Sequence, residues 1–193
     1  MDSGMAEQDY RYAFEQVTTM GFSKSWMEGS AGWALLDEAR SDSEEFPWFW
    51  QATHDDSAVY VTVTATKSDA WRPVAATVHL EPTHIYPRRT FRMDPYGKRD
   101  IQVTWLDKEA EWEAHCNVVG DQQVFRMRVP LSSFRGESDP TRPMRINVEV
   151  TFLSADKKKQ VTKMWAQSSG DNLMSRLGYG AADPREMGWL VRE

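Results

Sequence analysis

The sequence lacks most of the features that mark specialised classes of protein. Among its 193 residues there is a single cysteine, Cys116, so no internal disulfide can form. No apolar run approaches the roughly 20 residues that cross a bilayer. Met1–Glu7 has neither the basic region nor the apolar region of a signal peptide. We therefore expect no membrane span, and we expect any export signal to lie outside this sequence.

Positive charge is also in short supply. Lysine and arginine total 23, against 29 aspartates and glutamates, which gives a formal net charge of −6. Affinity for nucleic acid depends on neutralising phosphates with lysine and arginine, and an acidic surface equally disfavours anionic membranes. The acidic run Asp37–Glu45 is typical of a solvated loop, and Lys157–Lys159 is expected at a hairpin tip. We predict no nucleic-acid partner and no membrane partner.

The common catalytic signatures are missing as well. There is no glycine-rich phosphate loop, no G-x-S-x-G elbow and no H-E-x-x-H motif. Cys116 occupies an inward strand position, where a thiol is more often inert packing than a nucleophile. His79 and Glu81 share a strand face, but zinc needs three or four convergent ligands. Glu111 and Glu113 also share a face, and nothing else marks them as an acid–base pair. We expect no enzymatic activity.

Alternation between apolar and other residues is what the sequence has in abundance. Strict period-two patterning places one set of side chains toward a core and the other toward water. Polar turns such as Gly120-Asp121 and Asp156-Lys157 separate the runs and suit hairpins. Regular short strands with polar turns favour a β-sandwich over a βαβ fold. The alternating runs are Val59–Ala65, Val74–Leu80, Ile101–Trp105, Trp112–Val118, Phe125–Val129 and Ile146–Phe152.

The N-terminus follows a different period. Apolar residues recur at helical spacing between Tyr10 and Val17, and Gly21 is a suitable C-terminal stop. This pattern predicts a short helix over residues 6–21.

The predicted fold is all-β, an antiparallel sandwich of jelly-roll type with this short N-terminal helix. Residues 1–25 form an N-terminal extension in this interpretation, and residues 26–193 form one sandwich domain. The tail is expected to end in an edge strand at Trp189–Val191.

Aromatic residues are unusually frequent, with nine tryptophans, eight phenylalanines and six tyrosines. We expect four of the tryptophans to lie in the core or in strand pairs: Trp48, Trp50, Trp105 and Trp112. Trp71 lies in a polar stretch between Asp69 and Arg72, where an aromatic ring is either exposed for recognition or folded back as a lid. Nine tryptophans exceed the need of one small core, so exposed aromatic rings are expected.

The order of these features resembles the family 9 carbohydrate-binding modules and their DOMON-type relatives. The similarity begins at "WQATHDDSAVYVTVTA" and continues through "SDAWRPVAATVHLEP" and "RTFRMDPYGK". It extends over about 140 residues, and the succession of segments carries it. The matching segments are residues 50–65, 68–82, 89–98, 109–134 and 143–152, followed by the tail.

The resemblance implies a sugar site. In sugar-binding members two tryptophan rings clamp a terminal sugar, because pyranoses have apolar faces that stack on aromatic rings and hydroxyls that need paired donors and acceptors. Trp71 matches the first clamp, and Arg92 matches the arginine that binds the sugar. Thr77 stands where the family has an acidic residue, and no tryptophan stands near Met174 for the second clamp. Trp165 is the nearest tryptophan and is our third ligand-binding candidate, with core packing as the alternative.

The function implied is that of a non-catalytic carbohydrate-binding module, stacking a sugar on an exposed tryptophan. We expect a carbohydrate ligand and a parent chain that is secreted or on the surface of a bacterium, such as a glycoside hydrolase or polysaccharide lyase. One alternative is a structural or docking sandwich that supports a neighbouring catalytic domain of the same parent chain. A less favoured alternative is a haem-binding electron-transfer domain, with His84 and Met93 or His115 and Met164 as ligands.

No cofactor is expected, although the resemblance leaves a structural calcium ion open. Calcium takes six to eight oxygen ligands. Asp55 and Asp56, beside His54, and the stretch around Asp171 are the acidic turns that offer such oxygens. For His54 itself a hairpin apex is the favoured interpretation, ahead of a metal corner.

Overall fold

The chain folds into β-strands in the computed structural model, which describes residues 17–22, 39–40, 44–55, 57–81, 89–103, 111–134, 144–165 and 188–192. Within these ranges there are twelve strands and one short 3-10 helix, η1 (Leu131–Phe134). The strands are β1 (Val17–Phe22), β2 (Ala39–Arg40), β3 (Trp48–His54), β4 (Ala58–Thr66), β5 (Trp71–Glu81), β6 (Arg89–Met93), β7 (Arg99–Val103), β8 (Glu113–Val119), β9 (Gln122–Pro130), β10 (Met144–Ser154), β11 (Gln160–Met164) and β12 (Gly188–Arg192). No helix in the described part is long and apolar enough to cross a membrane.

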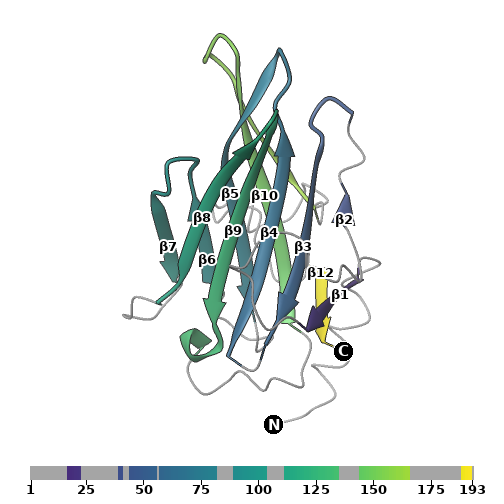
Figure 1. Cartoon of the computed structure of the whole chain (residues 1–193), viewed down its shortest axis with the longest axis vertical. Coiled ribbons are helices and arrows are strands. Elements are labelled where there is room, and N and C mark those ends of the chain that lie inside the picture. Colours follow the sequence, from purple (N-terminus) through teal and green to yellow (C-terminus); the bar gives the residue numbers. More distant parts are fainter. Residues whose placement is uncertain are drawn as a thin grey trace, which may run out of the picture.

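Two antiparallel sheets face each other and form a sandwich (Figure 1). The front sheet has the order β3-β4-β9-β8, and the back sheet has the order β10-β5-β6-β7, with β11 also paired to β10. The predicted all-β sandwich is therefore confirmed.

Strands β1 and β12 join the two sheets along one side. β12 pairs antiparallel with β10 and parallel with β1, and β1 pairs parallel with β3. The predicted strand at Trp189–Val191 is confirmed, but its placement at an edge is wrong, because it has a neighbour on each side. The helix predicted over residues 6–21 is wrong in its last part, since Val17–Phe22 form β1. Residues 6–16 lie outside the described part, and the domain boundary at residue 25 stays a prediction.

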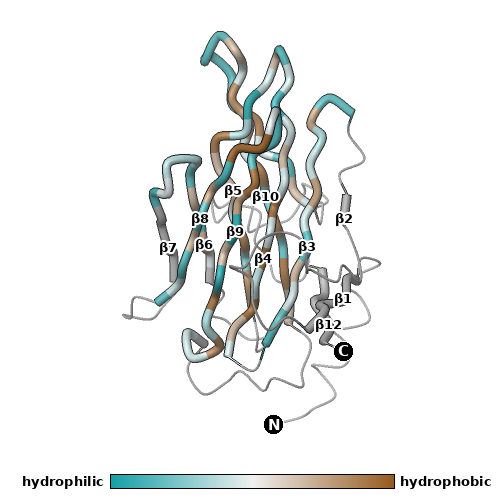
Figure 2. The backbone as a smooth tube through the Cα atoms, in the orientation of Figure 1, coloured by the Kyte–Doolittle hydropathy of each residue, from teal (hydrophilic) through white to brown (hydrophobic). Residues whose placement is uncertain are grey.

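The core lies between the sheets and is built from the alternating apolar residues of both. Trp50, Val61 and Phe125 of the front sheet are fully buried, as are Phe91 and Phe152 of the back sheet. Figure 2 shows the change of hydropathy along the strands that this alternation produces. The predicted core positions of Trp48 and Trp112 are also confirmed, whereas Trp105 lies outside the described residues. Burial of these inward rows is the main stabilising contribution to the sandwich.

A β-bulge interrupts the alternation of β5 at Val74. Ala75 pairs with Thr151 of β10, but the next pair joins Pro73 to Phe152, so Val74 is an extra residue. The expectation that Val74 faces the core with Ala76 is therefore wrong, and its side chain is only partly buried. Because side chains alternate with period two, one extra residue exchanges the faces of everything before it.

We expect Phe91→Ala to lower the free energy of unfolding by about 3–5 kcal/mol, as is typical for a buried phenylalanine. Phe91 is fully buried and packs edge-on against Trp112, with 5.4 Å between ring centroids. Chemical denaturation followed by tryptophan fluorescence measures the change. Val118→Ala is the control, because Val118 is 68% exposed and should change stability by no more than about 0.5 kcal/mol. A loss below 1 kcal/mol for Phe91→Ala would contradict the placement of the core.

Candidate functional site

The bulge in β5 decides where Trp71 points. Pro73 pairs with the buried Phe152, and Trp71, two residues earlier, pairs with Ser154, so both face the inside of the sandwich. The Trp71 indole packs on Phe46, with 5.0 Å between ring centroids and a 52° tilt. Phe46 in turn packs edge-on against Phe152. Trp71 thus lies at the margin of the core, half-buried, rather than free in a loop.

Polar groups surround the exposed side of this ring. The indole Nε1 donates a hydrogen bond to Glu45 Oε1 at 3.0 Å, and the backbone N–H of Trp71 donates to Ser68 Oγ at 3.1 Å. Lys163 Nζ lies 4.5 Å from the centre of the Phe46 ring, in cation–π geometry. We call Glu45, Phe46, Trp71 and Lys163 the Trp71 cluster. It offers an aromatic surface, a carboxylate acceptor and an ammonium donor within one small area.

Arg92 lies elsewhere. It pairs with Thr77, between the buried Phe91 and Met93, so its exposed side chain is on the outer face of the back sheet. Trp71 faces the inside, and five residues of β5 separate it from Thr77. The structure therefore does not bring Trp71 and Arg92 together.

Trp165 is a third separate position. It follows β11, packs edge-on against Trp50 at 4.9 Å and is half-buried. Its N–H donates to the Val148 carbonyl, six residues along β10 from the Ser154 that pairs with Trp71. At roughly 3.3 Å per residue these positions on β10 are about 20 Å apart, and the two rings pack on different aromatic residues, Trp165 on Trp50 and Trp71 on Phe46.

Two groups of polar contacts were not predicted from the sequence. Glu45 belongs to the acidic run that suggested a solvated loop, and its role depends on the fold of distant segments. On the outer face of the back sheet, His79 contacts Thr90 Oγ1 and Glu149 Oε1, both at 2.9 Å. His79 and Glu149 come from β5 and β10, and each is largely buried. Period-two patterning identified the face of His79, but its partner requires the strand register.

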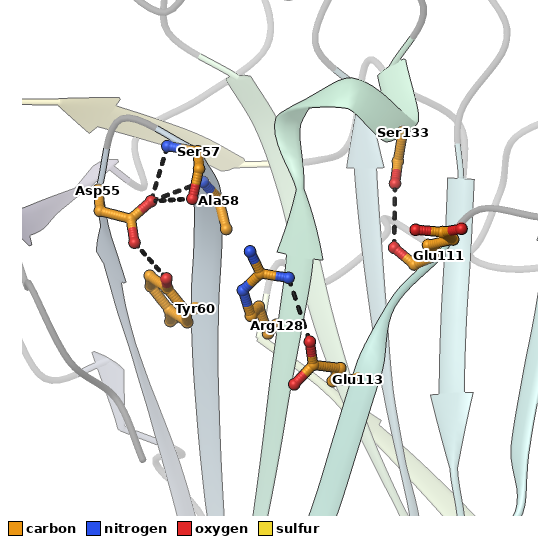
Figure 3. Close-up of polar contacts among 8 residues, drawn as sticks. All are labelled: Asp55, Ser57, Ala58, Tyr60, Glu111, Glu113, Arg128 and Ser133. Carbon is orange, nitrogen blue, oxygen red and sulfur yellow. Dashed lines mark hydrogen bonds and ion pairs between the residues drawn. The ribbon is translucent and has the colours of Figure 1, made fainter. Parts of the chain in front are cut away.

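The Asp55 turn has a structural role (Figure 3). Asp55 Oδ1 accepts hydrogen bonds from the Ser57 N–H at 2.7 Å, the Ser57 hydroxyl at 2.8 Å and the Ala58 N–H at 2.8 Å. Its other oxygen accepts from the Tyr60 hydroxyl. Partial burial by itself raises the pKa of Asp55, but the bonds from Tyr60, Ser57 and Ala58 together outweigh it, so the pKa lies below its usual value. The carboxylate is thus committed to closing the β3–β4 turn.

The described residues hold no group of three histidine, cysteine or acidic side chains placed to bind a metal ion. Asp56 and Asp171, named as potential calcium ligands, and His84, named as a haem ligand, lie outside these residues. Met93 is fully buried in the core cluster. Burial, with a smaller contribution from the charge of Asp94, raises the pKa of the Cys116 thiol to about 11. A thiol with this pKa is protonated at neutral pH and is a poor nucleophile.

Comparison with solved structures identifies the fold. The chain is similar to a family 9 carbohydrate-binding module from Caldicellulosiruptor kristjanssonii in complex with glucose, with a TM-score of 0.67 and 10% identity over 92% of this chain and 96% of that one. The structure of such a module from the same organism in complex with cellotriose matches with the same TM-score and 11% identity, over 92% and 94% of the two chains. No family model and no curated protein matches the sequence. At this identity the likeness shows the fold, and the predicted family 9-like sandwich is confirmed.

The lowered pKa of Asp55 predicts a specific acid sensitivity. A carboxylate whose pKa is lower in the folded protein than in the unfolded chain, where it is about 3.9, stabilises the fold above that value. This stabilisation is lost as the pH falls through the folded pKa. We expect Asp55→Asn to flatten the decline of stability between about pH 5 and pH 2, as measured by chemical denaturation at each pH. Asp121→Asn, at the exposed β8–β9 turn, is the matched control, and an equal slope in both variants would contradict the role of Asp55.

Proposed function

We propose that this protein is a non-catalytic carbohydrate-binding domain and that a sugar binds at the Trp71 cluster. The observation that carries the proposal is the half-buried indole of Trp71, fixed on one side by Phe46 and at Nε1 by Glu45. A ring held in this way offers a rigid apolar surface to the C–H face of a pyranose at little entropic cost. The fold supports the proposal, because structures with this fold have been solved with glucose and cellotriose.

The neighbouring charges suit sugar hydroxyls. Glu45 accepts one hydrogen bond from Trp71 and retains acceptor capacity for a hydroxyl donor. Lys163 carries an ammonium group whose three hydrogens can be donated to hydroxyl oxygens. The mixture of one carboxylate and one ammonium fits a neutral sugar, for which both donors and acceptors are needed.

The same cluster is poorly equipped for hydrolysis. Cleavage of a glycosidic bond ordinarily requires two carboxyl groups on either side of it, about 5–9 Å apart. Among the described residues of the Trp71 cluster, Glu45 is the one carboxylate. We therefore propose recognition without cleavage, in a domain that belongs to a larger glycan-active protein and holds that protein's catalytic domain near its substrate.

Arg92 remains a proposed ligand contact through the family resemblance. Its position on the outer face of the back sheet separates it from Trp71, so we propose that the two residues act on different parts of the surface. Trp165 is proposed as support for the core through its contact with Trp50 rather than as a second stacking ring.

We expect Trp71→Ala to weaken binding of cello-oligosaccharides at least tenfold, which corresponds to about 1.4 kcal/mol. Isothermal titration calorimetry and affinity electrophoresis measure the effect. Tyr96→Ala is the matched control, because Tyr96 is an aromatic residue that is 91% exposed in the β6–β7 turn and should leave the affinity unchanged. Arg92→Ala should also leave this ligand's affinity unchanged. If folded Trp71→Ala protein bound as tightly as the unaltered chain, the site would lie elsewhere.

A further inference from the structure

The outer face of the front sheet carries an ordered row of polar residues. The pairing of β3, β4, β9 and β8 places Gln51 beside Thr62, Thr62 beside Arg126, and Arg126 beside His115. These residues alternate with the core residues of their strands, so all four point away from the core. We call Gln51, Thr62 and Arg126 the Thr62 row.

Polar oxygens in and beside this row are buried without partners. Gln51 Oε1, Thr62 Oγ1 and, on the adjacent row, Thr53 Oγ1 are buried and make no hydrogen bond to any residue that the structure describes. Thr53 is 1% exposed and Thr62 is 5% exposed. An unsatisfied buried polar group costs about 1–3 kcal/mol, and valine has nearly the same shape as threonine. Three such oxygens lie close together on this face, and a ligand that reached them could supply the missing hydrogen bonds.

Arg126 is the charged member of the row, and it is uncommitted. Arg128, two residues along β9, donates to Glu113 at 3.2 Å and lies in hydrogen-bond reach of Tyr60 (Figure 3). Arg126 has no ion pair and no side-chain hydrogen bond to any residue of the described ranges. One guanidinium on this face is thus paired with a carboxylate, whereas the next has no such partner among the described residues.

Thr62 has a longer polar side chain beside it on each neighbouring strand. Gln51 and Arg126 stand on either side at the strand spacing of about 4.8 Å, and both have longer side chains than threonine. Rotation of these flexible side chains, without movement of the backbone, would expose the Thr62 hydroxyl to a ligand. A ligand that draws Arg126 toward its own negative charge favours this rotation.

We propose that the Thr62 row is a second carbohydrate site and that it takes an acidic sugar, a hexuronate residue. The guanidinium of Arg126 binds the carboxylate with two parallel hydrogen bonds, the geometry for which arginine is suited. Sugar hydroxyls donate to Gln51 Oε1 and Thr62 Oγ1, which satisfies the buried oxygens. A neutral sugar lacks the carboxylate and binds this row more weakly.

This site is independent of the Trp71 cluster. Trp71 faces the inside of the sandwich from the back sheet, whereas the Thr62 row is on the outer face of the front sheet. Loss of one site therefore leaves the other intact, and the failure of either proposal can be recognised separately.

The test is titration of the folded chain with oligogalacturonate in low salt, measured by calorimetry. We expect binding that Arg126→Ala weakens at least tenfold, whereas Arg126→Lys restores only part of it, because lysine keeps the charge but loses the paired geometry. Thr62→Val should weaken binding severalfold while leaving stability unchanged or increased, since it removes an unsatisfied hydroxyl. A merely structural role for Thr62 predicts instead that Thr62→Val lowers stability and leaves binding unchanged. Lys98→Ala, an exposed cation in the β6–β7 turn, is the matched control.

Three results would overturn the proposal. The first is absence of oligogalacturonate binding by the unaltered protein. The second is an equal loss in Arg126→Ala and Lys98→Ala, which indicates diffuse charge attraction. The third is loss of oligogalacturonate binding in Trp71→Ala, which places the acidic sugar on the Trp71 cluster and leaves the first proposal standing. Oligogalacturonate binding that survives Trp71→Ala and fails in Arg126→Ala supports the second site.

Discussion

The hydrophobic contact between the two sheets is the constraint on which the other features depend. Burial of the inward rows fixes which residues of each strand face the core, and so fixes which residues face outward. Fully buried rings such as Trp50 and Phe152 leave no freedom to shift a strand by one residue, because such a shift would expose them. Both proposed sites lie where this constraint ends, one at the margin of the core and one on the outer surface that it defines.

The bulge at Val74 shows how one extra residue changes which side chains share a face of the sheet. It changes the parity of β5, so Trp71 joins the inner side while Thr77 and Arg92 stay on the outer side. The family resemblance placed Trp71 and Arg92 in one site on the strength of their order in the sequence. The faces on which they lie depend instead on a local irregularity of hydrogen bonding, and irregularities of this kind are common next to functional residues.

The strands with strict alternation were predictable from sequence, because burial on one face leaves a period-two pattern. The turn at Gly120 was predictable too, since a two-residue hairpin turn needs positive φ and its φ is 64°. By contrast, the helical spacing of apolar residues between Tyr10 and Val17 predicted a helix as far as Gly21, yet Val17–Phe22 form a strand that pairs with two neighbours. Trp71 contacts Glu45, and Thr62 aligns with Arg126, because the fold brings distant segments together. No local pattern in the sequence indicates contacts or strand register of this kind.

The parallel pairing of β1 with β12 has a mechanical consequence. The first described strand, β1, begins at Val17 and the last, β12, ends at Arg192, and because the two strands run in the same direction these points lie at opposite ends of the pair. Tension along the chain therefore pulls the two strands lengthwise past each other and loads their hydrogen bonds together, in shear. Opening an antiparallel pair from its end would instead break such bonds one after another. The first and last described strands are thus loaded in shear, the geometry in which a pair of strands best resists being pulled apart.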